Sequence, residues 1–205
     1  MYKLAGLYAI TNQPPGVEQL TGDVRRALAG GARLIQYRDK GSDHARRVEE
    51  ARALLRLCRQ YRVPLIINDD IELASEVRAD GIHLGRQDAA LEDARDRLGR
   101  HCIIGVSCYN DFALAQQAVA LGADYIAFGA FFASGTKPSA VTASRDLLYR
   151  AKRELEIPVV AIGGITPHNA ADLLDAGADM LAVIQGLFAG PDIELAARAF
   201  SSLFD

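Results

Sequence analysis

The sequence predicts an α/β fold, a single (β/α)₈ TIM barrel that spans residues 1–205. Strand-like apolar runs alternate with amphipathic segments along the whole chain, which is the pattern of βα units. Several of these runs are almost continuously apolar, as expected for parallel strands that are covered on both faces. The 205 residues, half of them hydrophobic, are enough for one full core, and no low-complexity stretch marks a domain boundary.

A pattern of small residues recurs four times, over residues 29–35, 78–82, 121–126 and 176–181. Each copy ends a helix-like segment and begins an apolar run, and glycine suits such ends because it adopts the left-handed cap conformation at little steric cost. The aspartates of the last three copies are 44 (80 to 124) and 55 (124 to 179) residues apart. Each interval holds two βα units, since one βαβ crossover needs roughly 30 residues. Four copies therefore predict eight units.

The expected elements follow in order along the chain. Strands are expected over residues 6–11, 34–38, 65–68, 81–84, 103–107, 125–129, 159–163 and 181–184. Helices are expected over residues 17–28, 44–61, 71–77, 89–98, 112–121, 144–155, 167–175 and 193–204. In the second helix, Leu54, Leu55, Leu57 and Cys58 form an apolar stripe with helical periodicity.

Helix-start signals support two of these boundaries. Asp70 precedes the helix expected at residue 71 and is well placed to cap its first turn. Thr166 and Pro167 resemble an N-cap followed by proline at the first helical position. The competing α/β fold, a doubly wound open sheet, would need a glycine-rich dinucleotide loop after the first strand. Residues 11–16 (Thr-Asn-Gln-Pro-Pro-Gly) do not form one.

Composition argues against several partners and locations. The net charge of -3 and the pI near 5.8 argue against nucleic acid as the main partner. No apolar run approaches the roughly 20 residues of a membrane span, and the apolar N-terminal stretch is too short for a signal peptide. Cys58, Cys102 and Cys108 are odd in number and irregularly spaced, which suits reduced thiols better than a disulfide framework or a zinc site. We therefore expect a cytoplasmic protein.

Carboxylates follow two consecutive strands at the end where barrel enzymes place their chemistry. The strand ending at Asn68 is followed by Asp69 and Asp70, and the strand over residues 81–84 is followed closely by Asp88. If these strands are parallel neighbours, Asp69 and Asp88 meet at one mouth. Mg²⁺ typically takes one or two carboxylates together with phosphate oxygens and water, so the pair predicts a Mg²⁺ site. Asp88 could equally cap the helix that begins near residue 89.

Cationic residues follow the second strand, which ends in Gln36, Tyr37, Arg38, Asp39 and Lys40. Strand alternation puts Gln36 and Arg38 on the same side, toward the barrel mouth. Arg38 offers a planar fork and Lys40 a point charge to a polyphosphate. The alternative is a solvated loop with ordinary surface cations.

Polar residues at the next strands have competing interpretations. Ser107 can donate a hydrogen bond to a phosphate or simply close a turn. His83 lies mid-strand between apolar residues and is interpreted as a packed, hydrogen-bonded core histidine. Cys108 has no histidine nearby in the sequence to activate it, so we expect no catalytic role for it.

The loop after the sixth strand carries Ser134, Gly135, Thr136 and Lys137. Such a loop, with hydroxyl groups and one cation, can close over a phosphorylated substrate and exclude water. The alternative is a plain exposed turn.

Glycines and short polar turns follow the last two strands. In many barrels these two loops hold a phosphate on bare backbone N–H groups at a helix N-terminus. Gly163 and Gly164 would permit that approach after the seventh strand, and Ile184 and Gln185 stand at the matching place after the eighth. A tight strand-to-helix turn is the alternative.

Seven motifs in one order resemble the bacterial thiamine-phosphate synthase family. They lie at residues 7–11, 36–40, 67–69, 81–88, 105–107, 134–137 and 160–165. The resemblance implies a (β/α)₈ barrel that joins a hydroxymethylpyrimidine diphosphate to a thiazole phosphate. It implies a transferase of thiamine biosynthesis that requires Mg²⁺ and forms thiamine monophosphate and pyrophosphate.

The resemblance also implies roles for individual residues. The pyrimidine diphosphate would be lined by Gln36, Tyr37, Arg38, Asp39, Lys40 and Asn68, with Ser107 and Lys137 holding its diphosphate. Mg²⁺ would be bound by Asp69 and Asp88. The thiazole phosphate would be held by Ser134, Gly135, Thr136, Gly164, Ile184 and Gln185. The family often has Thr at position 134 and Ser at position 185, so the thiazole phosphate site departs most from the family pattern.

The chemistry of the residues agrees with this resemblance. Departure of pyrophosphate builds negative charge that Arg38, Lys40 and Lys137 can neutralise, with Ser107 as a donor. The thiazole nitrogen already has a free lone pair, so no general base is needed, and catalysis rests on electrostatic stabilisation and positioning.

Two other functions, and several properties of this one, stay open at this point. A related thiazole tautomerase would need a proton-transfer residue, such as a histidine after the fifth strand, where residues 107–110 read Ser-Cys-Tyr-Asn. A non-catalytic barrel could bind a phosphorylated ligand. The sequence also leaves open a homo-oligomer, the order of substrate binding and the loop that closes.

Overall fold

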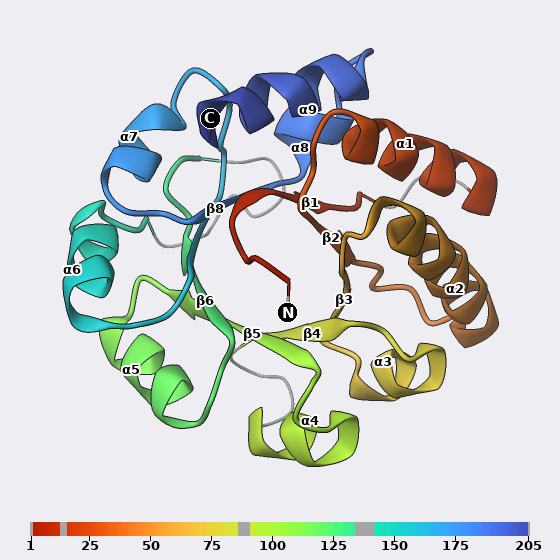
Figure 1. Cartoon of the computed structure of the whole chain (residues 1–205), viewed down its shortest axis with the longest axis horizontal. Helices are drawn as coiled ribbons and strands as arrows, with labels where there is room; N and C mark the ends of the chain where they lie inside the picture. Colours follow the sequence, from red (N-terminus) through yellow and green to blue (C-terminus); the bar gives the residue numbers. More distant parts are fainter. Residues whose placement is uncertain (1, 13–15, 86–90, 134–141, 205) are drawn as a thin grey trace.

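The chain forms a closed barrel of eight parallel strands with helices around its outside (Figure 1). The computed structural model describes residues 2–12, 16–85, 91–133 and 142–204. Strands β1 to β8 pair in sequence order, and β8 returns to pair with β1. The predicted (β/α)₈ fold is confirmed.

The strands and helices alternate along the chain. The strands are β1 Gly6–Ile10, β2 Leu34–Tyr37, β3 Leu65–Asn68, β4 Gly81–Leu84, β5 Ile103–Tyr109, β6 Tyr125–Gly129, β7 Val159–Ile162 and β8 Met180–Val183. The helices are α1 Val17–Ala29, α2 His44–Tyr61, α3 Ile71–Val77, α4 Leu91–Leu98, α5 Phe112–Ala120, α6 Asp146–Glu154, α7 Ala171–Asp175, α8 Gln185–Phe188 and α9 Ile193–Ser201, followed by the 3₁₀ turn η1 Ser202–Phe204. Among the described residues, no helix is both long enough and apolar enough to cross a membrane.

The start of α7 differs from the sequence-based expectation. The helix begins at Ala171 rather than at residue 167. The N–H of Thr166 donates to Oδ1 of Asn169 at 2.8 Å, and Nδ2 of Asn169 donates to the carbonyl of Gly164 at 3.1 Å. These bonds close a turn ahead of the helix, so the predicted N-cap at Thr166 is wrong. The short helix α8 was also not expected.

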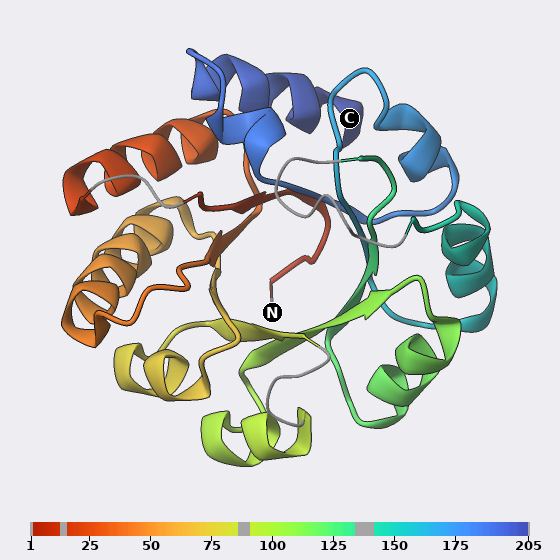
Figure 2. The ribbon, with the colours of Figure 1, turned by 180° about the vertical axis from the view of Figure 1, so that it is seen from behind.

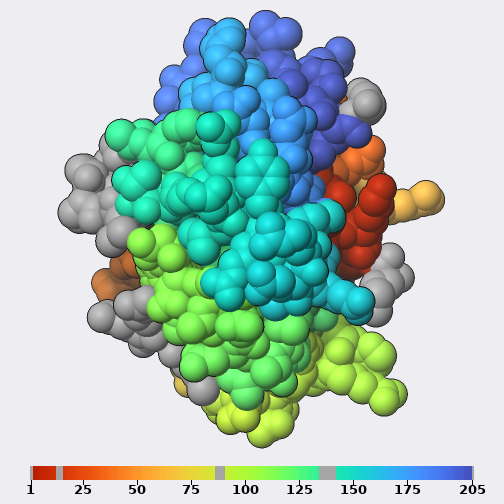
Figure 3. Space-filling model, turned by 90° about the vertical axis from the view of Figure 1, so that its left-hand side faces the viewer, coloured from red at the N-terminus to blue at the C-terminus, as the bar shows by residue number. Residues whose placement is uncertain are grey.

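Side chains along each strand alternate between the barrel interior and the layer beneath the helices. The interior cluster consists of Tyr8, Ile10, Leu34, Ile66, Tyr125, Ala127, Val160, Met180 and Ala182. A larger cluster fills the layer between strands and helices and includes the apolar stripe of α2. The helices form a continuous outer surface on which α5 and α6 are neighbours (Figure 3), with the guanidinium of Arg150 3.8 Å from the ring centroid of Phe112.

The repeated aspartates tie neighbouring strands together at the N-terminal rim of the barrel. Asp80, Asp124 and Asp179 directly precede β4, β6 and β8. Their carboxylates accept backbone N–H bonds at 2.9, 2.8 and 2.9 Å from the starts of β3, β5 and β7, respectively. Each carboxylate therefore satisfies an N–H group at a strand start that would otherwise lack a partner. The repeat seen in the sequence has a structural purpose.

The residues that precede β1 lie across the ring of strands in both face-on views (Figures 1 and 2). Leu4 packs against the interior cluster from this side. The N-terminal end of the barrel is thus covered by the chain itself.

Candidate active site

Strand β2 sends consecutive side chains in opposite directions. Gln36 points into the barrel, where its Nε2 donates to the hydroxyl of Tyr8 at 2.6 Å. Tyr37 packs in the outer layer, and its hydroxyl donates to Oε2 of Glu50 on α2 at 2.6 Å. Burial, followed by the nearby Glu50 carboxylate, raises the pKa of Tyr37 well above its usual range. The side chain of Tyr37 is therefore buried against α2, and its contact with the substrate stays a prediction.

The carboxylate of Asp39 is also directed at α2 rather than into the mouth. Its Oδ2 lies 2.8 Å from Nη1 of Arg46, and the same Nη1 lies 2.9 Å from Oε2 of Glu50. Its Oδ1 accepts the backbone N–H of Gly41 at 2.6 Å. These bonds hold the loop after β2 against α2. The Asp39 side chain therefore fixes the loop that carries Arg38 and Lys40, and its contact with the substrate stays a prediction.

The structure brings the end of β2 close to the end of β3. The backbone N–H of Arg38 donates to Oγ1 of the buried Thr11 at 3.0 Å, which anchors the loop to the end of β1. The side chain of Lys40 is 61% exposed, and its Nζ lies 4.0 Å from Oδ2 of Asp69. A cation and a carboxylate from neighbouring strands thus meet at the mouth.

Asp69 and Asp70 serve different purposes. Asp70 caps α3, since its Oδ1 accepts the N–H of Leu73 at 2.8 Å, and its Oδ2 pairs with Arg47 at 2.9 Å. Asp69 has a positive φ of 64°, which Asp tolerates better than most residues, and its backbone N–H is bonded to the carbonyl of His83 at 2.9 Å. The predicted cap at Asp70 is confirmed, and Asp69 is the acid turned toward Lys40.

The surroundings of Asp69 fit a hard cation. Its side chain is 31% exposed, and its Oδ2 accepts a hydrogen bond from Nδ2 of Asn68 at 2.6 Å. A partly exposed, oriented carboxylate is the kind of ligand that Mg²⁺ takes together with phosphate oxygens and water. Within the described residues, no group of three or more His, Cys, Asp or Glu side chains forms a metal cluster. The predicted partner, Asp88, lies outside the described residues, so Mg²⁺ binding stays a prediction.

The end of β5 is linked to the barrel interior. Nε2 of His83 lies 2.8 Å from Oγ of Ser107, and Nδ1 lies 3.0 Å from the hydroxyl of Tyr125. His83 is the buried, hydrogen-bonded core histidine that the sequence predicts. Its contact with Ser107 was not predicted. Cys108, the next residue, faces the outer layer, and burial raises the pKa of its thiol to about 12, which keeps it protonated and unreactive.

The glycines after β7 support the stem of the loop after β6. Gly164 has a φ of 61°, and a Cβ atom there would collide with Phe132 and Ala133. The N–H of Phe132 donates to the carbonyl of Gly163 at 3.0 Å. The loop therefore leaves the barrel directly against these glycines. Its predicted site residues Ser134, Gly135, Thr136 and Lys137 lie outside the described residues.

Ile184 and Gln185 stand between β8 and α8. Ile184 is half-buried and packs against the interior cluster, whereas Gln185 is exposed as the first residue of α8. The turn after β8 therefore begins inside the barrel and reaches solvent within one residue. A role in binding the thiazole phosphate stays a prediction for both residues.

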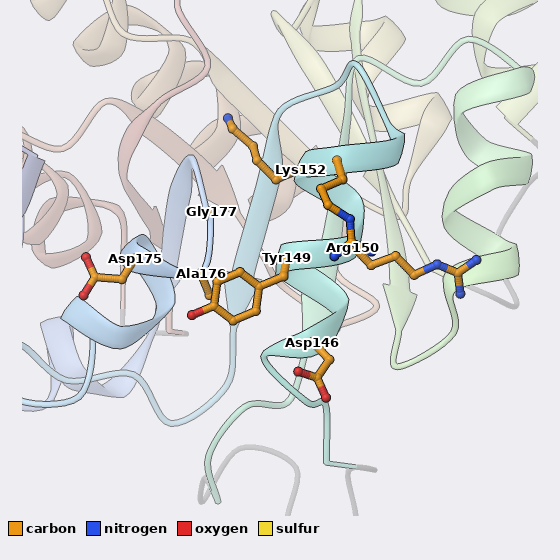
Figure 4. Close-up of a pocket in the computed structure, with 8 residues that line it drawn as sticks. Asp146, Tyr149, Arg150, Lys152, Asp175, Ala176 and Gly177 are labelled. Atoms are coloured by element: carbon orange, nitrogen blue, oxygen red, sulfur yellow. The ribbon is translucent and has the colours of Figure 1, made fainter.

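A surface hollow lies away from the mouth, between α6 and the turn before β8 (Figure 4). Its volume is about 550 Å³, and its lining includes Tyr149 and Arg150 of α6 and Gly177 of the turn. None of the residues that line it comes from the carboxyl end of a strand. We therefore do not assign it to the reaction.

A closed (β/α)₈ barrel whose cationic, carboxylate and hydroxyl groups gather at the carboxyl ends of its strands has the form of a barrel enzyme. Residues 7–187 match the profile of the thiamine monophosphate synthase family, and the chain belongs to this family. It is an enzyme of the thiamine-phosphate synthase type, a transferase of thiamine biosynthesis.

Relatives with this name match nearly the whole chain. The thiamine-phosphate synthase of Thiobacillus denitrificans is 52% identical over 199 residues, which are 97% of this chain and 94% of the relative. That of Marinobacter nauticus is 54% identical over 202 residues, 97% of this chain and 90% of the relative. A solved thiamine phosphate pyrophosphorylase from Pyrococcus furiosus superposes with a TM-score of 0.86 at 33% identity, over 97% of this chain and 95% of that one. These relatives do not support the tautomerase alternative.

Proposed function

We propose that the mouth of the barrel catalyses the reaction of this chain by stabilising the departing pyrophosphate with fixed cations and hydrogen-bond donors. The chain condenses 4-amino-2-methyl-5-(diphosphooxymethyl)pyrimidine with a thiazole phosphate to give thiamine monophosphate and pyrophosphate. The C–O bond to the diphosphate breaks, its electron pair leaves with pyrophosphate, and the thiazole nitrogen forms the new C–N bond. No proton has to leave the attacking nitrogen.

The observation that carries the mechanism is the meeting of Lys40 and Asp69. Their charged groups lie 4.0 Å apart at the carboxyl ends of adjacent strands, at a place that solvent reaches. Lys40 and Arg38 then neutralise the charge that develops on the leaving pyrophosphate, because cations held in place need no reorganisation during the reaction. The ion pair of the buried Asp39 carboxylate with Arg46 supports this by holding the loop between the two cations.

We assign the remaining predicted residues to the two substrates. Asn68 and Gln36 are assigned to the pyrimidine, and the Ser107 hydroxyl is assigned as a donor to the diphosphate. Asp69, with Asp88 as its expected partner, would hold Mg²⁺, which when bound neutralises charge on the diphosphate oxygens.

The thiazole phosphate is assigned to the turns after β7 and β8 and to the loop after β6. Backbone N–H groups near Gly164, Ile184 and Gln185 suit a phosphate because glycine permits a close approach. Ser134 keeps the hydroxyl of the threonine that the family often has, whereas Gln185 does not replace a serine hydroxyl. Gln185→Ser is thus the substitution that separates a backbone contact from a hydroxyl contact.

We further propose small molecules rather than nucleic acid as partners and the cytoplasm as the location. The net charge of -3 supports the former. Three free, buried cysteines support the latter, because oxidising compartments favour disulfides.

The test compares two neighbouring aspartates. Thiamine monophosphate formation is measured with Mg²⁺ and after its chelation, for the wild type, Asp69→Asn and Asp70→Asn. Asn tolerates the positive φ of residue 69 and keeps a cap acceptor at residue 70, so both variants should fold. We expect kcat/KM to fall about 100-fold for Asp69→Asn and to stay near the wild-type value for Asp70→Asn.

Calorimetry gives a second measurement that does not depend on turnover. Binding of Mg²⁺ in the presence of pyrophosphate should weaken for Asp69→Asn and not for Asp70→Asn. Undiminished turnover and unchanged Mg²⁺ binding in Asp69→Asn would remove the metal role of this residue.

A further inference from the structure

A continuous chain of hydrogen bonds crosses the barrel interior and joins the ends of two distant strands. Nε2 of Gln36 donates to the hydroxyl of Tyr8 at 2.6 Å, and this hydroxyl lies 2.8 Å from that of Tyr125. The Tyr125 hydroxyl lies 3.0 Å from Nδ1 of His83, whose Nε2 lies 2.8 Å from Oγ of Ser107. The five side chains come from five strands, and both ends of the chain are residues assigned to the substrate.

The side chains in the middle of this hydrogen-bond chain are buried and closely packed. Tyr8 and Tyr125 are fully buried, with their rings edge to face at 86° and centroids 5.9 Å apart. The His83 ring stacks on Tyr125 at 20° with a centroid separation of 5.6 Å. Burial raises the pKa of both tyrosines, so their hydroxyls stay protonated and keep their hydrogen-bonding roles. Buried polar groups of this kind are costly unless each has a partner, so the chain holds together as a unit.

Strand β5 is adapted to this arrangement. A Cβ atom at Gly105 would collide with the ring and hydroxyl of Tyr125. Gly105 is two residues before Ser107 and faces the same side of the strand. Strand β5 therefore makes room for Tyr125 in the middle of the hydrogen-bond chain and supplies Ser107 at its end.

The available donors and acceptors favour one direction of hydrogen-bond donation, from Gln36 toward Ser107. Gln36 donates to the Tyr8 oxygen, so the Tyr8 hydrogen is left for Tyr125. Tyr125 then donates to Nδ1 of His83, which places the imidazole proton on Nε2 and directs it at Ser107. The Ser107 oxygen accepts, and its own hydrogen is available to the mouth. In the opposite direction, the Tyr8 hydroxyl would be a buried donor for which the described residues supply no further acceptor.

We propose that Tyr8, Tyr125 and His83 are positioning residues that orient the Ser107 hydroxyl as a donor to the diphosphate and hold the Gln36 amide in place. The proposal rests on the proposed function in one respect, the contact of Ser107 with the diphosphate. The proposal explains why the Ser107 hydroxyl is oriented for that contact. A serine at a strand end could rotate its hydroxyl freely, whereas a donor from His83 excludes the orientation in which the hydroxyl hydrogen points at the imidazole.

Tyr125→Phe removes one oxygen and keeps the ring that His83 stacks on. We expect the KM for the pyrimidine diphosphate to rise about tenfold, because one directed hydrogen bond is lost at Ser107. The KM for the thiazole phosphate should stay within about twofold. In ¹⁵N NMR, the His83 ring should change from the Nε2–H tautomer to a mixture. Its signals are assigned by their loss in His83→Gln.

His83 provides a pair of variants that do not depend on Tyr125. His83→Gln keeps an amide donor near the position of Nε2, so its KM should lie close to that of the wild type. His83→Leu has no donor and should match Tyr125→Phe. A matched control, Ser201→Ala, removes a hydroxyl that donates to the carbonyl of Gly30 at 2.9 Å between α9 and the end of α1, and it should leave both KM values unchanged.

Ser107→Ala separates this inference from the proposed function. If Ser107→Ala leaves the KM of the pyrimidine diphosphate unchanged, the assigned role of Ser107 fails and the proposal falls with it. If Ser107→Ala raises this KM but Tyr125→Phe and His83→Leu do not, the positioning role alone is overturned. In the double variant Tyr125→Phe/Ser107→Ala, the effects should not add, because both act on one hydroxyl. Additive effects would also overturn the proposal.

Discussion

Aspartates at the two rims of the barrel have different partners. At the N-terminal rim, the carboxylates of Asp80, Asp124 and Asp179 accept backbone N–H bonds from the starts of neighbouring strands. At the C-terminal rim, the carboxylate of Asp69 lies beside the exposed ammonium of Lys40. The first group is satisfied by the chain's own backbone and stabilises the barrel. Asp69 is partly exposed to solvent and lies where a ligand can reach it.

The difference agrees with a barrel in which residues at the strand starts stabilise the fold and residues at the strand ends, as we propose, act on the substrates. All eight strands run the same way, so every strand start is at one rim and every strand end at the other. Carboxylates at the starts meet N–H groups that need acceptors, whereas residues at the ends lead into the loops where barrel enzymes place their chemistry. The same type of residue therefore has opposite purposes at the two rims.

Two equally exposed lysines test this division with the largest expected effect. Lys40 and Lys152 are 61% and 59% exposed, and each lies near an aspartate, Asp69 at the C-terminal rim and Asp179 at the N-terminal rim. Lys40→Met should lower kcat/KM about 100-fold, because a cation next to the leaving group is lost. Lys152→Met should not change kcat/KM. The free energy of unfolding of both variants should lie within about 0.5 kcal/mol of the wild-type value, since exposed ion pairs contribute little to stability.

Steady-state kinetics and urea unfolding on the same preparations would check this pair of variants. Equal losses of activity in Lys40→Met and Lys152→Met would break the division between the rims.

Removing an acid from the N-terminal rim should affect stability and leave catalysis intact. Asp124→Ala leaves the buried N–H of Ile104 without its side-chain acceptor and removes the ion pair with Arg95, and we expect a loss of about 2 kcal/mol in the free energy of unfolding. The kcat/KM of the folded enzyme should not change. The control is Asp96→Ala, which removes an exposed carboxylate from α4 and should alter stability by less than about 0.5 kcal/mol.

Denaturant unfolding combined with activity per folded molecule distinguishes these outcomes. A fall in kcat/KM for Asp124→Ala at full folding would mean that the N-terminal rim also shapes the mouth.

The smallest expected effect concerns Cys108, which lies near the C-terminal rim but faces the outer layer. Burial raises the pKa of its thiol from 9.0 to about 12. The native state therefore holds this proton more tightly than the unfolded state does. The resulting stabilisation is complete below pH 9 and is lost as the pH rises from about 9 to about 12.

Compared with Cys108→Ala, the wild type should therefore lose stability faster above pH 9, while kcat/KM at neutral pH is the same for both. Urea unfolding at about pH 8 and about pH 10.5 measures the difference. A constant difference between the two proteins at both pH values would contradict a buried, protonated thiol. It would also weaken the distinction between residues that lie near the mouth and residues that face it.

Local patterns were enough to predict most of the fold and the parts of the site that lie on one strand. Apolar periodicity predicted eight strands, and the run of Asn68, Asp69 and Asp70 predicted both a cap and an acid at the mouth. Alternation along β2 placed Gln36 and Arg38 on the inner side, which implies that Tyr37 faces outward. The resemblance nevertheless assigned the whole run of residues 36–40 to the substrate, although the side chains of Tyr37 and Asp39 are bonded to residues of α2.

The sequence by itself determined the order of the elements, their parallel arrangement and the residues at the strand ends, because these depend on spacing along one chain segment. Only the tertiary structure decided which distant side chains meet. Tyr8 and Tyr125 are 117 residues apart, and the contact of their hydroxyls depends on barrel closure and strand register. For the same reason, the repeated aspartates were visible as a pattern, but their bonds to neighbouring strands became visible only when the strand starts were brought to one rim.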